Sequence, residues 1–283
     1  MTELRYEIVD VFTDRPFAGN PLAVVFDAEQ LDDDRMQAIA REFNFSETAF
    51  VLPPDTAADY RVRIFTPRKE LPFAGHPSVG TAATLVRRGM LPAGELVQQC
   101  GVGDLPVTAT ARVAQLAGGA ASIGPELDPA PVLAAVGLTE ADLAGPAPRL
   151  AGCGIDSVHL LVRPDALARI DLHERVLRAD GWTLSVSVWN PDRNESLARV
   201  FAPDLSVPED PATGSAALAH GVYLATTGLL PGDGEHSYRV RQGVEIGRPS
   251  TLDCSVSVVD GQVVGTTVSG AVAPVATGVL TLA

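Results

Sequence analysis

Two short segments of the chain combine polar side chains with glycine and proline in a pattern typical of helix starts. Residues 72–77 read Pro-Phe-Ala-Gly-His-Pro, and residues 209–215 read Glu-Asp-Pro-Ala-Thr-Gly-Ser. Proline suits the first turn of a helix, and glycine gives the backbone freedom there, so each segment predicts a helix N-terminus. The unpaired N–H groups of such a turn, with the positive end of the helix dipole, bind anions. The chemistry indicated is recognition of a small anion.

The polar residues of these segments have structural and functional interpretations. His76 lies between Gly75 and the first helical turn, where a core needs no histidine, so we favour a proton carrier or a hydrogen-bond donor. Asp210 precedes a proline at a helix start, where an aspartate commonly serves as N-cap. Gly214 and Ser215 would serve close packing, but with an upstream aspartate they also form an oxyanion-type nest. Because the other segment holds an equivalent turn, we favour function, with capping alongside it.

A third candidate is Glu47, which opens an apolar segment predicted to be a strand at residues 47–52. At the edge of a core, partial desolvation tunes a carboxyl group for proton transfer. A solvent-exposed glutamate at the start of a strand is the simpler interpretation, and this segment alone favours it.

The elements around the two helix starts occur twice in the same order. Residues 63–94 and residues 199–232 each read as a strand Arg-X-Phe-X-Pro, a proline-containing turn, a helix of small residues and a Gly-X-Leu-Pro or Gly-Leu-Leu-Pro stop. We therefore expect two related halves, with the two helix-start turns facing each other across a cleft.

Periodicity predicts α+β halves in which antiparallel strands surround one long helix. The predicted strands span residues 4–13, 20–26, 47–52, 59–66, 95–99, 105–116, 157–162, 183–188 and 196–201, with helices at 32–43, 77–88 and 212–226. Asp260-Gly261 predicts a hairpin in a strand-rich tail. Glycine and proline between residues 118 and 151 predict a crossing with at most one short helix, at 130–136. The predicted domains are 1–120, a crossing at 121–150, and 151–283, whose last strands are free to return to the N-terminal half.

Composition excludes several classes of partner. A net charge of −14 disfavours nucleic acid and anionic membranes. The sequence has no apolar run of about 20 residues and no signal-peptide pattern, so we expect a cytoplasmic protein that is not bound to a membrane. The cysteines, Cys100, Cys153 and Cys254, are odd in number and widely spaced, which indicates neither a disulfide framework nor a zinc site. We expect no metal and no cofactor.

Four motifs together resemble the phenazine-biosynthesis PhzF family. They are Gly-Asn-Pro-Leu-Ala-Val-Val at 19–25, Ser-Glu-Thr-Ala-Phe-Val at 46–51, the Phe-Thr-Pro to Gly-His-Pro stretch at 65–77, and Glu-Asp-Pro-Ala-Thr-Gly-Ser-Ala at 209–216. The resemblance implies a diaminopimelate-epimerase-like fold, with two pseudo-symmetric halves, each a mostly antiparallel sheet rolled around a central helix. One departure is Ser78, where the family often has threonine.

The resemblance also implies a reaction and a set of roles. The family's named reaction isomerises a dihydro-hydroxyanthranilate by moving a proton between ring carbons, without cofactor or metal. It implies that Glu47 is the general acid/base. The other residues implied around the substrate are His76, Asp210, Ser215 and the backbone near Gly75 and Gly214.

Other functions stay open at this point. Epimerases of this fold use two cysteines, one at each helix start, and no cysteine of this chain lies in either turn. A racemase or a hydrolase-like enzyme acting on an unrelated substrate, and a non-catalytic binding protein, remain alternatives. The predicted ligand is a small carboxylate whose identity the sequence does not give, and a homodimer is the prior expectation for the oligomeric state.

Overall fold

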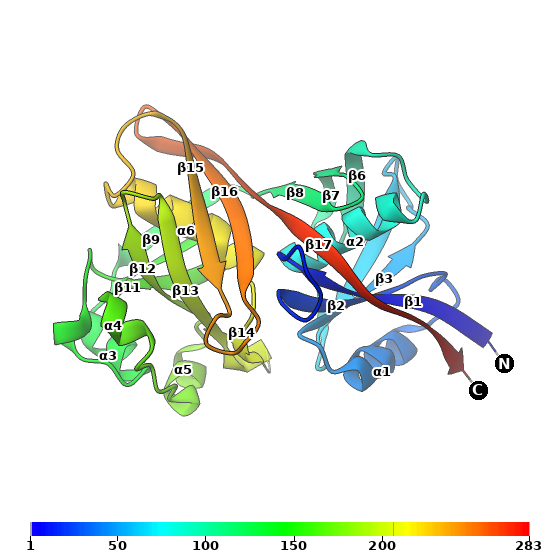
Figure 1. Ribbon diagram of the computed structural model, residues 1–283, viewed down its shortest axis with the longest axis horizontal. Helices are drawn as coiled ribbons and strands as arrows, with labels where there is room; N and C mark the ends of the chain where they lie inside the picture. Colours follow the sequence, from blue (N-terminus) through cyan, green and yellow to red (C-terminus); the bar gives the residue numbers. More distant parts are fainter. Residues whose placement is uncertain (1, 206, 283) are drawn as a thin grey trace. The chain divides into compact units, whose positions relative to one another are not determined.

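The structure is a computed structural model that describes residues 2–205 and 207–282. Its chain divides into two compact units, residues 1–117 with 269–283, and residues 118–268. The chain passes between them twice, after Ala117 and again along a single long strand, β17 (Gln262–Leu282). Figure 1 shows β17, in red, beside the first strand, in dark blue.

The first unit contains most of the N-terminal half. Its strands are β1 (Thr2–Val11), β2 (Asn20–Val25), β3 (Glu47–Leu52), β4 (Tyr60–Phe65), β5 (Glu70–Leu71), β6 (Gly94–Cys100), β7 (Gly103–Ala109) and β8 (Val113–Ala117). Its helices are α1 (Asp33–Phe43) and α2 (Gly75–Arg87). β1 pairs antiparallel with both β2 and β17, β2 pairs parallel with β3, and β3 pairs antiparallel with β4.

In the first unit, alternate side chains along each strand pack against two different helices. Val25 and Phe50 lie in a hydrophobic cluster with Met36 of α1. The opposite face meets α2, where a Cβ on Gly80 would come within 2.6 Å of the Leu22 side chain. Side chains of a strand point alternately to its two faces. Glu47 is three positions from Phe50 in β3, so its side chain lies on the opposite face, the one that meets α2. α2 is buried from its first residue to Leu85 and forms the centre of the unit.

The second unit repeats this arrangement with more helices. Its strands are β9 (Ala121–Glu126), β10 (Arg149–Cys153), β11 (Asp156–Leu161), β12 (Leu184–Asn190), β13 (Glu195–Ala202), β14 (Val207–Asp210), β15 (Gly234–Gln242) and β16 (Ser250–Val259). Its helices are α3 (Pro129–Ala134), α4 (Pro164–Leu167), α5 (Glu174–Asp180) and α6 (Gly214–Thr226), with 3-10 turns η1 (Glu140–Asp142) and η2 (Pro203–Leu205). The parallel pair β11–β12 and the antiparallel pair β12–β13 match β2–β3 and β3–β4.

The two faces of the second sheet differ in polarity. Val158, Leu184 and Phe201 pack in an apolar cluster that also includes residues of α3, α4 and α5. The face toward α6 is polar: Ser157 bonds the buried His159 (2.9 Å), and Ser196 bonds His220 of α6 (2.7 Å). α6 is therefore a buried central helix like α2, and buried histidines form part of its polar surroundings.

Several predicted boundaries are wrong. The helix predicted from residue 77 begins at Gly75, because Ala74 is the extended N-cap residue, and the one predicted from residue 212 begins at Gly214. The strand predicted at 105–116 is two strands, since the Thr110 hydroxyl accepts from the backbone of Arg112 and Val113 and closes a turn. The stretch 121–150 contains β9, α3 and η1 rather than one short helix alone.

The predicted hairpin is confirmed at Asp260-Gly261. These two residues join β16 to β17 with φ of 51° and 71°, the left-handed conformation that two-residue hairpin turns require. The Ser255 and Thr267 hydroxyls bond at 2.8 Å across the two strands.

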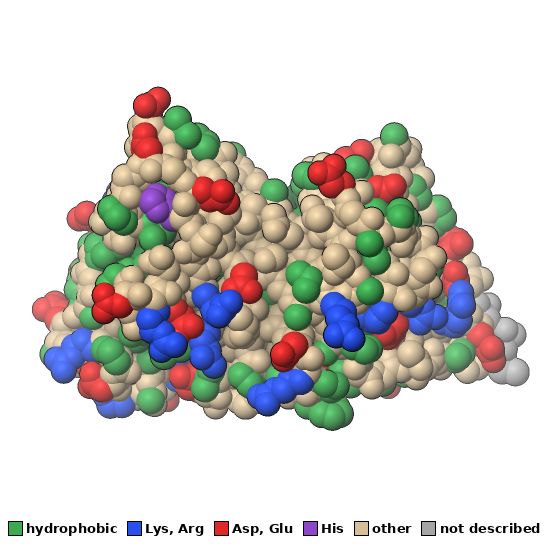
Figure 2. Space-filling model, turned by 45° about the horizontal axis from the view of Figure 1, so that its top comes forward, with side chains coloured by type: hydrophobic (Ala, Val, Ile, Leu, Met, Phe, Trp, Pro, Cys, Tyr) green, Lys and Arg blue, Asp and Glu red, His purple; other side chains and the backbone are tan. Residues whose placement is uncertain are grey.

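Figure 2 shows Lys and Arg side chains alongside acidic ones in the lower part of the face that it draws, whereas the Asp and Glu side chains in its upper part have no basic neighbours in view. Among the described residues, no helix has the length and apolar character needed to cross a membrane.

Gly19 sets the entry into β2, and replacing it should destabilise the first unit. Its φ is +67°, and a Cβ there would lie 2.3 Å from the backbone oxygen of Val11. Gly89 has nearly the same φ, +68°, with no atom within 4 Å of the added Cβ. We expect Gly89→Ala to cost about 1–2 kcal/mol from the backbone alone. Gly19→Ala should add about 1–3 kcal/mol of steric crowding to that cost. Denaturant unfolding of both variants checks this, and equal losses would contradict it.

Candidate active site

Glu47 and His76 lie together in the first unit. Glu47 is the first residue of β3, and its side chain is 12% exposed. His76 is the second residue of α2 and is buried. Glu47 Oε2 lies 3.6 Å from His76 Nδ1. The structure therefore places these two predicted residues side by side, and the interpretation of Glu47 as a solvent-exposed residue is wrong.

Two residues that sequence analysis did not single out hold His76 in place. Asn20, the fully buried first residue of β2, lies with its side-chain Nδ2 3.3 Å from His76 Nδ1. The Ser46 hydroxyl donates to Asn20 Oδ1 at 3.0 Å. Asn20 and Ser46 both occur in the motifs that carry the family resemblance. In the sequence, each of these polar residues stands next to an apolar strand segment, which could have marked it as a candidate. Its contact partner, however, depends on the tertiary fold.

The His76 ring is neutral in this environment. Burial lowers the pKa of His76 to about 3, because the charged imidazolium loses its hydration. The Asn20 amide turns its Nδ2–H group toward His76 Nδ1, an orientation that favours an accepting Nδ1 and a ring proton on Nε2. His76 Nε2 is buried and has no hydrogen-bond partner among the described residues. Of the two roles left open by the sequence, the geometry favours the hydrogen-bond donor.

Asp210 lies in a turn before the second central helix. It ends β14, and the Thr213 hydroxyl donates to its Oδ2 at 2.5 Å. Gln242 Nε2 donates to the Asp210 carbonyl oxygen at 2.7 Å, and Gln242 Oε1 accepts from the Thr213 backbone at 3.2 Å. The predicted N-cap role of Asp210 is wrong, because Thr213 is the N-cap residue and the carboxylate binds its hydroxyl. Gln242 was missed by sequence analysis, since its position in a distant strand gave no signal.

Gly214 and Ser215 begin α6 as Gly75 and His76 begin α2. Gly214 is buried, and Ser215 is half-buried. The turn before them is fixed further by the Ser250 hydroxyl, which donates to the Pro211 carbonyl oxygen at 2.9 Å. Each central helix thus starts in a turn that side-chain hydrogen bonds hold in place. The second helical residue differs, being His76 in α2 and Ser215 in α6.

The second unit has no carboxylate at the position of Glu47. Phe65 and Phe201 are equivalent in the repeated motif, and they pair with Thr48 and Leu184 respectively. The residue before Leu184 is Thr183, so a threonine occupies the place of Glu47. A hydroxyl group is a far weaker base than a carboxylate. The arrangement of strands therefore supplies one base of this kind and not a symmetric pair.

The predicted site residues belong to two different units. Glu47, Gly75 and His76 belong to the first unit, whereas Asp210, Gly214 and Ser215 belong to the second. Each group is described within its own unit, and a shared ligand stays a prediction.

The described residues contain no disulfide and no cluster of metal-ligating side chains. All three cysteines are free, and burial raises the pKa of the Cys153 and Cys254 thiols. Within residues 2–205 and 207–282, no three His, Cys, Asp or Glu side chains come together as a metal site.

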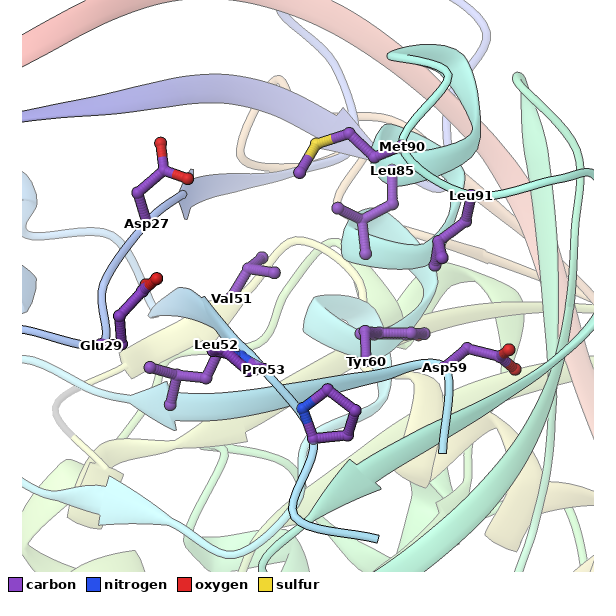
Figure 3. A pocket seen from close by; sticks show the side chains of 11 residues that line it. Asp27, Glu29, Val51, Leu52, Pro53, Asp59, Tyr60, Leu85, Met90 and Leu91 are labelled. Carbon is purple, nitrogen blue, oxygen red and sulfur yellow. The ribbon is translucent and has the colours of Figure 1, made fainter. Parts of the chain in front are cut away.

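A pocket of about 230 Å³ also lies in the first unit, but away from this group (Figure 3). Its lining includes Leu85, in the last turn of α2, and Met90, which follows that helix, and it contains neither Glu47 nor His76. The pocket is therefore separate from the candidate active site.

Comparisons with known proteins agree with the motifs. The family model described as phenazine biosynthesis-like protein matches residues 9–278. A trans-2,3-dihydro-3-hydroxyanthranilate isomerase from Pseudomonas aeruginosa is 36% identical over 261 residues, 88% of each chain. A protein from Mesorhizobium japonicum named as an uncharacterized isomerase is 37% identical over 301 residues, covering 99% of each chain.

Solved structures show the same architecture. The crystal structure of a Bacillus anthracis phenazine biosynthesis protein of the PhzF family superimposes over 100% of both chains with a TM-score of 0.90 and 25% identity. A hydroxyproline epimerase from Agrobacterium vitis shares the fold, with a TM-score of 0.66 over 98% of this chain and 92% of its own at 16% identity. The predicted α+β, epimerase-like fold is confirmed.

Proposed function

Because the chain belongs to the phenazine biosynthesis-like PhzF family and is an isomerase, we propose that it moves a proton between carbons of a small carboxylate of the trans-2,3-dihydro-3-hydroxyanthranilate type. The observation that carries this proposal is the Glu47 carboxyl group, nearly buried and 3.6 Å from a neutral histidine at a helix N-terminus.

Glu47 is the general acid/base of the proposed reaction. Its carboxylate takes a proton from an activated carbon, the C–H electron pair moves into the conjugated system, and the resulting carboxyl group returns the proton to a second carbon. Substrate and product are isomers, so no other reactant is consumed. One carboxylate suffices for both transfers, which agrees with Thr183 standing where a second base would be.

The surrounding groups stabilise the negative charge that develops on the substrate. His76 Nε2–H is a buried donor without a protein partner, and the first N–H groups of α2 start at Gly75 beside it. In the second unit, Asp210 is proposed as a further catalytic residue, with Gly214 and Ser215 binding the substrate at the start of α6.

We expect purified protein to convert trans-2,3-dihydro-3-hydroxyanthranilate and to leave the configuration of L-proline and trans-4-hydroxy-L-proline unchanged. Proton NMR follows the loss of the substrate's ring proton, and polarimetry follows the two amino acids. Epimerisation of either amino acid without conversion of the dihydroanthranilate would replace this proposal with the epimerase alternative. Binding of the dihydroanthranilate without any proton exchange would favour a non-catalytic binding protein.

A further inference from the structure

Asn20 belongs to a motif to which the proposed reaction gives no role. Its side chain is fully buried between two polar partners, His76 Nδ1 at 3.3 Å and the Ser46 hydroxyl at 3.0 Å. Its backbone is fixed by pairing with Val11 in the β1–β2 ladder. A buried amide in a fixed strand, with both ends engaged, holds the ring that it contacts in one orientation.

The amide also determines which ring nitrogen of His76 carries the proton. The Ser46 hydroxyl donates to Asn20 Oδ1, so the amide presents its NH₂ group to His76. Glu47 Oε2 also faces Nδ1, but at 3.6 Å it lies beyond hydrogen-bond distance, whereas Asn20 Nδ2 lies at 3.3 Å. Nδ1 is then the lone-pair nitrogen, and the proton of the neutral ring lies on Nε2. The opposite tautomer would direct two N–H donors at each other.

We propose that Asn20, anchored by Ser46, is a positioning residue that locks His76 in the Nε2–H tautomer, so that a donor is presented to the substrate. This rests on the proposed function for the identity of the ligand, but not for the tautomer itself. His76 Nε2 is buried and without a partner among the described residues, and such a group calls for a functional explanation. A donor fixed before the substrate binds needs no reorganisation during the reaction.

Asn20→Asp is the sharpest test, because it keeps the size of the side chain but replaces the N–H donor that faces His76 with an acceptor. One carboxylate oxygen can still accept from Ser46, but the other can only accept from His76, so Nδ1 must become protonated. Asn190→Asp is the matched control, since Asn190 Oδ1 is already an acceptor, from the Asp192 backbone, and the side chain is exposed.

The tautomer is measured first, by ¹⁵N NMR of the histidine-labelled free protein at neutral pH. We expect the pattern of an Nε2-protonated ring for His76 in wild type and in Asn190→Asp, and protonation at Nδ1 in Asn20→Asp. Protonation at Nδ1 in wild type, or an unchanged pattern in Asn20→Asp, would overturn the inference. If Asn20→Asp does not fold, Asn20→Ala replaces it, and a mixture of the two tautomers is then expected.

Turnover of trans-2,3-dihydro-3-hydroxyanthranilate is measured second. Loss of one preorganised donor predicts a fall in kcat of about 10²-fold for Asn20→Asp, with a smaller change in KM. Ser46→Ala, which removes only the anchor, should lower kcat by about 3–10-fold. A switched tautomer with unchanged kcat would refute the positioning role. Absence of turnover in wild type would instead count against the proposed function, and the NMR result would still decide the tautomer.

Discussion

Replacing Glu47 by glutamine is expected to lower kcat by about 10²–10⁴-fold while the protein stays folded. The amide is almost the same size as the carboxylate but cannot take a proton from carbon. The Glu47 side chain, at the start of β3, is 12% exposed, and the substitution keeps its size and shape, so the fold should tolerate the change. The measurement is steady-state turnover of trans-2,3-dihydro-3-hydroxyanthranilate, with circular dichroism as the check on folding.

Glu195→Gln is the matched control for this variant. Glu195 is likewise the first residue of a strand, β13, and is likewise partly buried, but it lies in the second unit. Its substitution should leave kcat unchanged. Near-normal turnover by a folded Glu47→Gln protein would remove Glu47 from the mechanism.

Mild acid is expected to destabilise the protein strongly, because three histidines are buried in the neutral form. Burial lowers the pKa of His76 to about 3 and that of His220 to about 4, and it lowers the pKa of His159 well below 6.5, with a further lowering from His220. In the unfolded chain each would titrate near pH 6.5. Their contribution to stability is therefore complete above pH 6.5 and is lost as the pH falls below it, since only the unfolded chain then takes up the protons.

The size of the effect follows from the number of protons bound. Each histidine changes the free energy of unfolding by up to about 1.4 kcal/mol per pH unit, so three approach about 4 kcal/mol per unit. Denaturant unfolding between pH 6 and pH 5, where most carboxyl groups stay ionised in both states, measures this slope. His220→Asn should reduce the slope by about one third. A flat stability profile in wild type would contradict the prediction.

The repeated motifs were sufficient to predict the two central helices but not their first residues. Proline 77 suggested a helix start, yet Ala74 is the cap and His76 lies inside the first turn. That shift matters because it places His76 Nε2 and the first free N–H groups of α2 in the same turn. In the second unit the helix starts two residues later than predicted instead of two earlier, and the cap is Thr213 and not Asp210.

The candidate site could be predicted only in part, because its supporting residues depend on tertiary contacts. Glu47 and His76 could be named from motifs, and strand β3 has the predicted bounds, 47–52. Asn20 and Gln242 could not be assigned partners, since each contacts a residue about 30 or more positions away. The polar face beneath α6, with His159 and His220, was likewise missed. Alternation predicts which side chains share a face, but it does not identify the helix that covers them.

The central claim is that Glu47 carries a substrate proton from one carbon to another, and the reaction in D₂O tests it most directly. A proton held by a carboxyl group can exchange with solvent before it is returned. The account predicts deuterium at the receiving carbon in at least a fraction of the product of wild type and of Glu195→Gln, and none formed at a comparable rate by Glu47→Gln. Conversion by Glu47→Gln at a rate close to that of wild type, with or without deuterium in the product, would show that Glu47 does not carry the proton and would contradict the account.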